Sequence, residues 1–500
     1  MPSRDTHVVV IGAGPVGLLL AGELRLAGVE VTIVDRLTAP MTESRAAQLT
    51  TRTAELLHQI GLDDLLSEAQ LEHSGHFGGL SFDLSTLKSP YAGNWKVPQF
   101  RTEAALAQRA LDLGASLWRG AELRGLDQLL DSVVCDVDTR GGATQLHAQY
   151  VVGCDGQDST VRSVAGFSFP VQAPERELLR SDITGLDLED RRFERLDKGL
   201  AVASTRHGVT RVMVHQYGHT PSERKGRVAF EEVVDAWKSV TGEDIGAGSP
   251  TWIDAFDNTH GHATEYRRGR VLLAGDAAHR HMPIGGQALN LGLQDASNLG
   301  WKLGAVVAGT AHEEILDSYH DERWPVGHHT MQWVRAQEQL LLGGPEVDPL
   351  RSVLAELITD PAVELELANT VSGLNIRYGS HATDSVVGYR LPDVAVVDES
   401  GTQTSSAELL GQGHGAYLSQ HDVSASPVQR ADIRRIANAR LSDETLPPRI
   451  LVRPDGYVVW ADDGDSDLDD AVHKWFGLPI GDRLASIARP PHTDMETQFS

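Results

Sequence analysis

Cysteine is almost absent from this sequence, which has only Cys135 and Cys154 among 500 residues. Two cysteines can form at most one disulfide, and they supply neither a zinc cluster nor a Cys-x-x-Cys redox pair. Such scarcity is typical of a reducing compartment, where disulfides are rare. We therefore expect a cytoplasmic protein without a metal site.

Long apolar runs are missing as well. Near the start of the chain, the longest stretch without a charged residue or histidine is 8–22, and its 15 residues are fewer than the ~20 needed to cross a bilayer. The stretch contains glycines and a proline, and no small-residue cleavage site follows it, so it resembles neither a membrane helix nor a signal peptide. The sequence predicts a soluble protein that does not contact a membrane.

Positive charge is the third shortage. Lys and Arg number 44 against 70 Asp and Glu, which gives a formal net charge of −26. Such a surface repels phosphate backbones and anionic lipids, so nucleic-acid binding is excluded as a function class. The length suggests about three domains.

Glycine, by contrast, is abundant, and three glycines define the first motif. Gly12, Gly14 and Gly17 form a GxGxxG pattern between a predicted strand at 7–11 and a predicted helix that ends near Leu26. In this pattern the first glycine allows a tight turn, the second lets backbone approach a pyrophosphate, and the third lets the helix pack on the strand. A second strand at 29–34 ends at Asp35, which is placed to accept hydrogen bonds from a ribose. The unit predicts dinucleotide binding; the alternative is a tight turn in an α/β core.

Two further strand-turn-helix patterns follow, at 150–162 and at 271–307. In the second, an acid at a strand end (Asp276) can bind a ribose or ribityl chain, and Gly285-Gly286 before a helix can present N–H groups to an anionic ring edge. The segment 171–260 alternates in short stretches and predicts an antiparallel sheet. Residues 449–460 predict a β-hairpin.

With these motifs the chain resembles the FAD-dependent aromatic hydroxylases, which are single-component flavoprotein monooxygenases. The resemblance rests on GxGxxG, Cys-Asp-Gly-x-x-Ser-x-Val-Arg at 154–162, Gly-Asp-Ala-Ala-His…Pro-x-Gly-Gly-Gln-x-x-Asn at 275–290, the segment 316–323, and Arg-Pro-Asp-Gly at 453–456. It covers nearly the whole chain. Within the family, the chain is most similar to hydroxylases of angucycline- and anthracycline-type aromatic polyketides, with the rifampicin monooxygenases as further relatives.

The resemblance implies an α/β fold with three parts. The parts are a Rossmann-type FAD-binding domain of the aromatic hydroxylase kind (1–75, 99–170 and 262–389), an inserted antiparallel-sheet substrate domain (76–98 and 171–261), and a thioredoxin-like C-terminal domain (390–487) followed by a tail (488–500). Because no cysteine lies beyond Cys154, the C-terminal domain cannot carry out dithiol chemistry.

The resemblance also assigns roles to individual residues. Near the adenosine and pyrophosphate of FAD it places Gly12, Gly14, Pro15, Val16, Gly17, Asp35 and Arg36. Along the cofactor chain it places Gln99, Gly275 and Asp276, and between FAD and the nicotinamide donor it places Asp155 and Gly156. Around the isoalloxazine it places Arg45, Pro283, Gly285, Gly286, Gln287, Ala288, Leu289 and Asn290, of which Arg45, Pro283 and Gly285 are the catalytic candidates.

The implied reaction uses FAD, NADPH and O2. NADPH reduces the flavin, and a flavin hydroperoxide then hydroxylates a polycyclic aromatic phenol of polyketide type. Baeyer–Villiger insertion and antibiotic-inactivating hydroxylation are alternatives on the same scaffold, and a non-redox binding or cyclisation protein is an alternative of another class. The chain shows one GxGxxG only, so we expect NADPH to bind transiently at a local basic patch. A homodimer is left open.

Several residues keep two interpretations. Ala288 stands where the family has glycine, which either alters the approach of the flavin or is harmless if φ is negative. Arg280 touches substrate or faces solvent, and Arg162 and His279 touch cofactor or are structural. His320 and Arg323 are interpreted as structural pairings within a helix. The aromatic residues expected in the pocket walls, or alternatively in the core, are His76, Phe77, Phe82, Tyr91 and Trp95.

Overall fold

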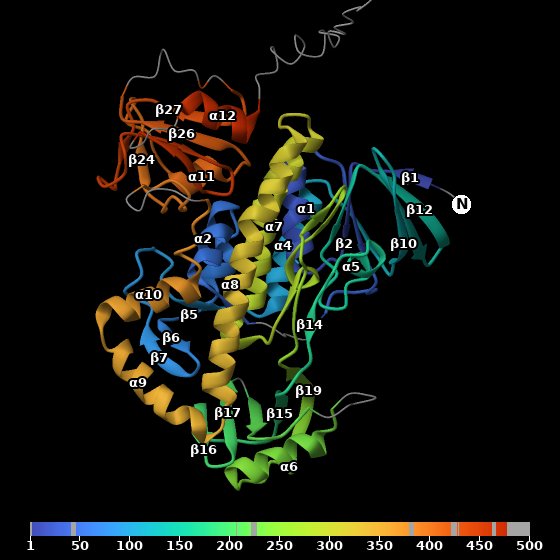
Figure 1. The fold of residues 1–500 in the computed structure, drawn as a ribbon, viewed down its shortest axis with the longest axis vertical. Helices are drawn as coiled ribbons and strands as arrows, with labels where there is room; N and C mark the ends of the chain where they lie inside the picture. Colours follow the sequence, from blue (N-terminus) through green and yellow to red (C-terminus); the bar gives the residue numbers. More distant parts are fainter. Residues whose placement is uncertain are drawn as a thin grey trace, which may run out of the picture.

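The computed structural model describes residues 3–41, 47–206, 208–221, 228–379, 385–421, 428, 430–462 and 467–477. In Figure 1, a sheet with covering helices fills the middle of the molecule, a second sheet lies at the lower end, and the C-terminal strands lie at the upper left. The fold is α/β, with one largely parallel sheet and several antiparallel ones, which confirms the predicted class.

The central sheet has six strands in the order β21-β22-β13-β2-β3-β9. They are β2 (Val8–Ile11), β3 (Val31–Asp35), β9 (Ser116–Arg119), β13 (Tyr150–Gly153), β21 (Arg267–Arg268) and β22 (Val271–Leu273). All neighbours are parallel except β21 and β22. β2 and β3 are buried throughout, because β-branched apolar strands of a parallel sheet are covered on both faces. The three predicted strand-turn-helix units therefore share one sheet.

Helix α1 (Pro15–Leu26) lies between α4 (Gln99–Asp112) and α7 (Gln287–Val307) and packs against both. The third predicted strand leads through the short turn η1 (Gly275–Ala277) toward η2 (Ile284–Gly286), which precedes α7. α5 (Thr160–Val164) follows β13. These helices bury the core that includes Leu18, Leu24 and Leu293.

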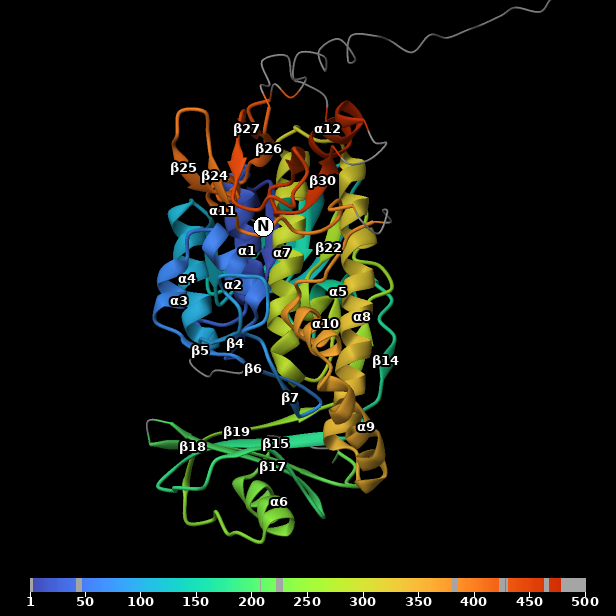
Figure 2. The same cartoon turned by 90° about the vertical axis from the view of Figure 1, so that its left-hand side faces the viewer.

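The predicted antiparallel sheet between 171 and 260 is present at the lower end of Figures 1 and 2. Its strands are β15 (Glu177–Thr184), β16 (Arg191–Leu196), β17 (Gly199–Arg206), β18 (Val209–Gln216) and β19 (Ser249–Asp257). Helix α6 (Phe230–Thr241), which the sequence patterns did not predict, covers one face of this sheet with Val233, Trp237 and Val240. The helix ends at Gly242, whose φ of 79° suits a left-handed cap.

Smaller sheets complete the first 280 residues. They comprise β1 (Ser3–Asp5), β10 (Glu122–Gln128), β11 (Val133–Thr139) and β12 (Gly142–Ala148) in one sheet, β4 (Gln48–Leu49), β5 (Gln70–Glu72) and β8 (Asn94–Lys96) in another, the hairpin β6 (Ser74–Phe77) and β7 (Leu80–Asp83), and β14 (Val171–Gln172), β20 (His260–His262) and β23 (His279–Arg280). Short helices α2 (Thr51–Gln59) and α3 (Asp63–Ser67) follow β4.

A long helix joins the central sheet to the inserted sheet. α8 (Asp317–Leu342) follows the turn η3 (Glu313–Leu316) and runs down the molecule in both views, and η4 (Pro345–Val347), α9 (Asp348–Ile358) and α10 (Pro361–Ser372) come after it. Leu200 and Met282 form a small core with Val334 of α8, which seals the contact between the inserted sheet and the helix.

The C-terminal part has a mixed four-stranded sheet in the order β27-β26-β29-β30. Its elements are β24 (Ala395–Val397), β25 (Gln403–Ser405), α11 (Ser406–Leu410), β26 (Gly415–Ser419), β27 (Ile433–Ile436), β28 (Arg440–Leu441), β29 (Arg449–Val452), β30 (Val458–Ala461) and α12 (Leu468–Phe476). β29 and β30 are antiparallel, which confirms the predicted hairpin. The turn of this hairpin docks on α2, where Arg52 Nη2 donates to Asp455 O at 3.0 Å and Gln59 Nε2 donates to Pro454 O at 2.7 Å.

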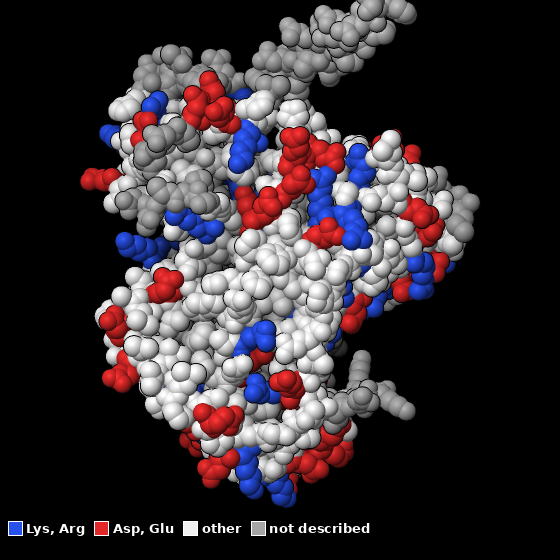
Figure 3. All heavy atoms as spheres, in the orientation of Figure 1, with Lys and Arg blue, Asp and Glu red and all other residues white. Residues whose placement is uncertain are grey.

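The surface reflects the acidic composition only in part. On the face shown in Figure 3, basic side chains lie beside acidic ones rather than in one separate patch. Among the helices that the structure describes, none has both the length and the hydropathy of a membrane span.

Candidate active site

The carboxyl ends of β2, β13 and β22 meet at one edge of the central sheet, so three distant motifs lie side by side. Gly12 follows β2 with φ of 105°, and a Cβ there would lie 2.3 Å from Cys154 O after β13. A Cβ at Gly17 would lie 2.1 Å from Gly12 O. Gly14 differs, because no atom of the described residues outside its own stretch of chain lies within 4 Å of its would-be Cβ. Gly12 and Gly17 are thus required by packing, whereas Gly14 faces open space.

The first turn of α1 faces the same edge. Gly14 is its N-cap and provides no side-chain cap, and Pro15 has no N–H. Asp35 at the end of β3 accepts hydrogen bonds from Ala13 N at 2.7 Å and Leu37 N at 2.8 Å. A carboxylate has about four acceptor positions, so Asp35 can brace the glycine turn and still bind a ribose hydroxyl.

The segment 154–162 forms a tight cap. Asp155 accepts from Ser159 Oγ at 2.5 Å and from Thr160 N at 2.7 Å, at the start of α5. Burial raises the pKa of the Asp155 carboxyl despite these hydrogen bonds. Gly156 has φ of 81° and open space around its would-be Cβ within the described chain. Asp155 therefore has a structural task, and Gly156 is the member of the pair that faces free space.

Arg162 contacts backbone carbonyls of two motif segments, which fits its structural interpretation, and contact with the cofactor stays a prediction. Its guanidinium donates to Ala277 O at 2.9 Å and Gln157 O at 2.8 Å, and it lies 3.8 Å from the centre of the Phe169 ring. The arginine thus ties the 154–162 segment to the Gly275–Ala277 turn.

A buried charge cluster contacts the Gly275–Ala277 turn. Asp295 of α7 accepts from Gly275 N at 3.1 Å, from His279 Nε2 at 2.7 Å and from Arg323 Nε at 2.7 Å. Burial alone would raise the pKa of the Asp295 carboxyl, but Arg323 and His279 outweigh it and hold that pKa below its usual value. His279 and Arg323 therefore have structural pairings. Asp276, by contrast, is exposed.

Of the other two uncertain residues, His320 accepts from Tyr266 N at 3.3 Å through Nδ1, which is a structural pairing. Arg280 is half-buried and lies 3.4 Å from Asp257 Oδ1, so it is held by a carboxylate of the inserted sheet.

The turn before α7 is built from two left-handed glycines, Gly285 with φ of 67° and Gly286 with φ of 70°. Gly286 caps α7 without a side-chain hydrogen bond. Ala288 lies inside α7, and among the described non-glycine residues only Phe193 and Asn438 have positive φ. The alanine therefore introduces no backbone strain, which favours the harmless interpretation. Pro283 precedes the turn, and Leu289 follows Ala288 in the helix.

Amide side chains lock this turn to its neighbours. Asn290 Oδ1 accepts from Thr50 N at 2.9 Å, and Asn290 Nδ2 donates to Gly286 O at 2.7 Å and Gln48 O at 3.1 Å. Gln287 Nε2 donates to Val371 O at 3.0 Å.

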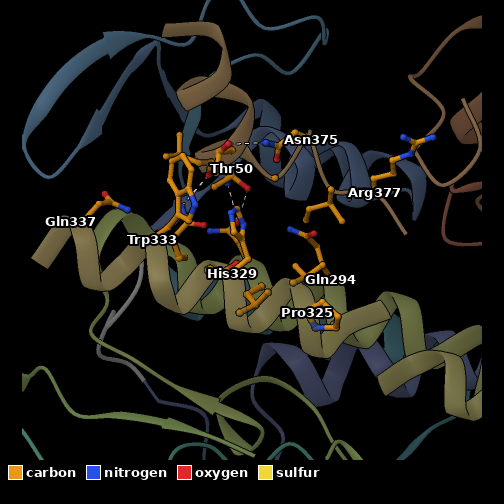
Figure 4. A pocket seen from close by; sticks show the side chains of 17 residues that line it. Thr50, Gln294, Pro325, His329, Trp333, Gln337, Asn375 and Arg377 are labelled. Carbon is orange, nitrogen blue, oxygen red and sulfur yellow. Dashed lines mark hydrogen bonds between the residues drawn. The ribbon is translucent and has the colours of Figure 1, made fainter. Parts of the chain in front are cut away.

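A pocket of about 290 Å³ opens beside the turn, between α7, α8 and the segment 370–377 (Figure 4). It is lined by Thr50, Gln287, Asn290, Leu291, Gln294, Pro325, Val326, His329, Thr330, Trp333, Gln337, Thr370, Val371, Gly373, Asn375, Ile376 and Arg377. Only Gln287 and Asn290 among them were predicted as site residues. One sequence signal was available: Gln287, Asn290 and Gln294 form a polar stripe at helical spacing.

None of the aromatic residues predicted for the walls lines this pocket. Phe77 and Phe82 are buried in a core cluster, and the His76 ring lies 4.5 Å from the Phe193 ring. Burial, helped by Arg192, lowers the pKa of His76 to about 4. Tyr91 and Trp95 pack against the main core. Their core interpretation fits these positions, and substrate contact stays a prediction.

The remaining predicted cofactor residues lie at scattered positions. Arg36 is exposed beyond β3, Val16 packs near Gly275, and Gln99 begins α4. Arg45 lies outside the described residues.

The residues present fit FAD. Open space at Gly14 and Gly156, an α1 start without a side-chain cap, and the exposed Asp276 lie along the edge where the three motif strands end. A helix N-terminus with unpaired N–H groups favours a phosphate.

The comparisons agree with this geometry. Residues 5–334 match a family model described as FAD binding domain, and residues 384–479 match aromatic-ring hydroxylase, C-terminal. The chain belongs to the FAD-dependent aromatic hydroxylases. This hydroxylase is 37% identical to the 12-dehydrotetracycline 5-monooxygenase/anhydrotetracycline 6-monooxygenase of Streptomyces rimosus, over 94% of this chain and 99% of the relative.

Other relatives span two kinds of named activity. The chain is 36% identical to a rifampicin monooxygenase of Streptomyces venezuelae, over 94% of this chain and 98% of the relative. The structure of CabE, an aromatic hydroxylase from angucycline biosynthesis, matches with a TM-score of 0.90 at 41% identity, over 95% and 99% of the two chains. A dialkyldecalin synthase of Streptomyces rugosporus is 35% identical, over 94% of this chain and 98% of the relative.

Proposed function

We propose that this hydroxylase adds one oxygen atom to a polycyclic phenol of the aromatic polyketide type, with bound FAD, NADPH and O2. The observation that carries the proposal is the shared edge of β2, β13 and β22, where Gly14 and Gly156 leave backbone open to a dinucleotide. Similarity to the tetracycline and rifampicin monooxygenases supports the substrate class.

The chain's own residues bind and orient in this proposal. The start of α1 receives the pyrophosphate, Asp35 the adenosine ribose, and Asp276 the ribityl chain. Bound FAD, reduced by the nicotinamide donor, supplies the activated oxygen. Pro283, Gly285 and Gly286 give the flavin ring a surface of backbone without bulky side chains, and Arg45 is proposed beside it. A phenol is already a ring nucleophile, so the protein mainly has to position it and exclude water.

A non-redox cyclisation function is the second candidate, because the dialkyldecalin synthase is similar over nearly the same span. An anaerobic titration with NADPH, with and without phenols, separates the two. Bleaching of the flavin absorbance supports the hydroxylase, whereas a flavin that no phenol makes reducible supports the second candidate.

The products decide among oxygenation outcomes. Incubation with a panel of polycyclic phenols, NADPH and air, followed by mass spectrometry and structure determination, should yield a new ring hydroxyl. A ring-expanded ester or lactone would instead indicate Baeyer–Villiger insertion. The three-part domain limits, the cytoplasmic location and a homodimer remain part of the proposal, and size-exclusion chromatography with light scattering tests the last.

A further inference from the structure

The pocket drawn in Figure 4 lies against one face of α7, and the glycine-rich motifs lie against another. Gln287, Asn290, Leu291 and Gln294 line it, and their spacing places them on one side of the helix. A Cβ at Gly292 would instead lie 2.7 Å from Val16 Cγ2 and 3.1 Å from Gly275 Cα, against the glycine-rich motifs. The first two turns of α7 therefore separate two spaces, one at the predicted cofactor edge and one against α8.

Gln294, which lines the pocket, has one buried polar atom without a partner among the described residues. Gln294 is 8% exposed, and its Oε1 has no hydrogen-bond partner within the described part of the chain. Leaving a buried acceptor unsatisfied costs roughly 1–3 kcal/mol. A ligand that donates a hydrogen bond there would remove this cost.

An aromatic surface stands nearby. Trp333 of α8 lines the pocket beside His329, whose ring centroid lies 5.5 Å from that of the indole. Phe77, which does not line the pocket, packs edge-on against the indole with ring centroids 5.1 Å apart. An indole fixed from behind offers a flat apolar face to a flat ring.

The charge of the lining also selects the ligand. In a chain of net charge −26, none of the described lining residues is Asp or Glu, and Arg377 is the one Lys or Arg among them. Arg377 itself is held by Val387 O at 3.2 Å and Ser385 O at 3.1 Å. A neutral aromatic ligand can enter such a lining without burying an unpaired carboxylate.

We infer that the α7–α8 pocket binds a planar phenol, with the phenolic O–H donating to Gln294 Oε1 and the ring stacked on Trp333. The inference rests on the proposed function, and it adds a recognition site away from the predicted aromatic walls. The volume lies near the lower end of the range of about 300–1,000 Å³ for small-molecule sites, so the pocket takes part of a polycyclic ligand.

The test compares two ligands of nearly equal shape by calorimetry, on the FAD-loaded protein without NADPH. 2-Naphthol carries the donor, and 2-methoxynaphthalene lacks it. The wild type should bind 2-naphthol about 3- to 10-fold more tightly, as one neutral hydrogen bond allows. Gln294→Met keeps the length of the side chain but removes the acceptor. In this variant the ratio of the two dissociation constants should be close to one.

Two variants control the test. Trp333→Phe should weaken the binding of both ligands and keep the preference for 2-naphthol. Gln332→Met, on the exposed side of α8, should change neither the affinities nor the preference. Equal preference in Gln294→Met and wild type, binding of neither ligand, or displacement of both ligands by NADP+ would overturn the inference. If the preference appears but no phenol stimulates NADPH oxidation, the site stands and the proposed function fails. If phenols are hydroxylated and Gln294→Met still prefers 2-naphthol, the proposed function stands and the inferred phenol site fails.

Discussion

The first two turns of α7 and the rest of that helix are held by different kinds of contact. Residues 287–294 use amide side chains, such as Asn290, that bond to backbone. From Asp295 onward the helix is held by buried charges: Lys302 Nζ lies 2.8 Å from Glu322 Oε2, and Arg453 reaches the same carboxylate from the C-terminal sheet.

We call the neutral hydrogen bonds of residues 287–294 adjustable contacts and the buried ion pairs from Asp295 onward fixed contacts, because breaking them costs different amounts of free energy. A neutral hydrogen bond contributes about 1 kcal/mol net, whereas removing one partner of a buried ion pair costs about 3–5 kcal/mol. The adjustable contacts lie next to the proposed flavin and phenol sites. The fixed contacts join α7, α8 and the Arg-Pro-Asp-Gly turn, so they tie the C-terminal part to both helices.

The largest expected effect comes from Glu322→Gln. This change leaves Lys302 and Arg453 buried with a weakened partner, and we expect the free energy of unfolding to fall by about 3–5 kcal/mol. Urea denaturation measures it. Glu314→Gln, an exposed carboxylate of η3, is the matched control and should stay within about 0.5 kcal/mol of wild type. A loss below 1 kcal/mol for Glu322→Gln would show that the buried cluster is no anchor.

The same comparison has a pH dependence. Burial raises the pKa of the Glu322 carboxyl, but Arg453 and Lys302 outweigh burial and lower it from 4.5 to about 2. A depressed carboxyl pKa stabilises the fold above the unfolded value of 4.5, and this stability is lost as pH falls toward 2. The stability gap between wild type and Glu322→Gln should therefore shrink by about 3 kcal/mol over that window. Unfolding curves at several pH values would contradict this prediction if the gap stayed constant.

A smaller effect is expected in the amide part. Asn290→Ala removes the bonds to Thr50, Gln48 and Gly286 and should cost about 1–3 kcal/mol. It should also weaken FAD binding, because the Gly285-Gly286 turn loses its tie. Flavin fluorescence titration measures this, with Asn369→Ala on α10 as a control outside this network. Unchanged FAD affinity would show that the Gly285-Gly286 turn does not contribute to FAD binding.

The smallest effect is expected for Ala288→Gly, which restores the family residue. Because Ala288 is helical and unstrained, the change should lower stability by at most about 1 kcal/mol and leave FAD affinity unaltered. Thermal unfolding and the same titration test it. Markedly tighter FAD binding in the glycine variant would mean that the methyl group obstructs the cofactor.

Local patterns were sufficient to predict the strand and the helix start at the glycine-rich edge of the central sheet. The β-branched run at 8–11 and the glycine spacing define β2 and the start of α1, because both depend on neighbours in sequence. The pocket was not predictable in the same way. The spacing of Gln287, Asn290 and Gln294 shows a polar face on α7, but only tertiary packing shows that Trp333 lies across from it. Asp155 likewise carries the family motif, yet its partners at 159 and 160 give it a capping role.

The most direct test of the account is a turnover in isotopically labelled dioxygen, with the FAD-loaded protein, NADPH and a polycyclic phenol that stimulates NADPH oxidation. The account predicts one labelled oxygen atom in a new ring hydroxyl and one NADPH consumed for each product molecule. A product without label, or a cyclised product of unchanged mass formed without NADPH, would contradict it.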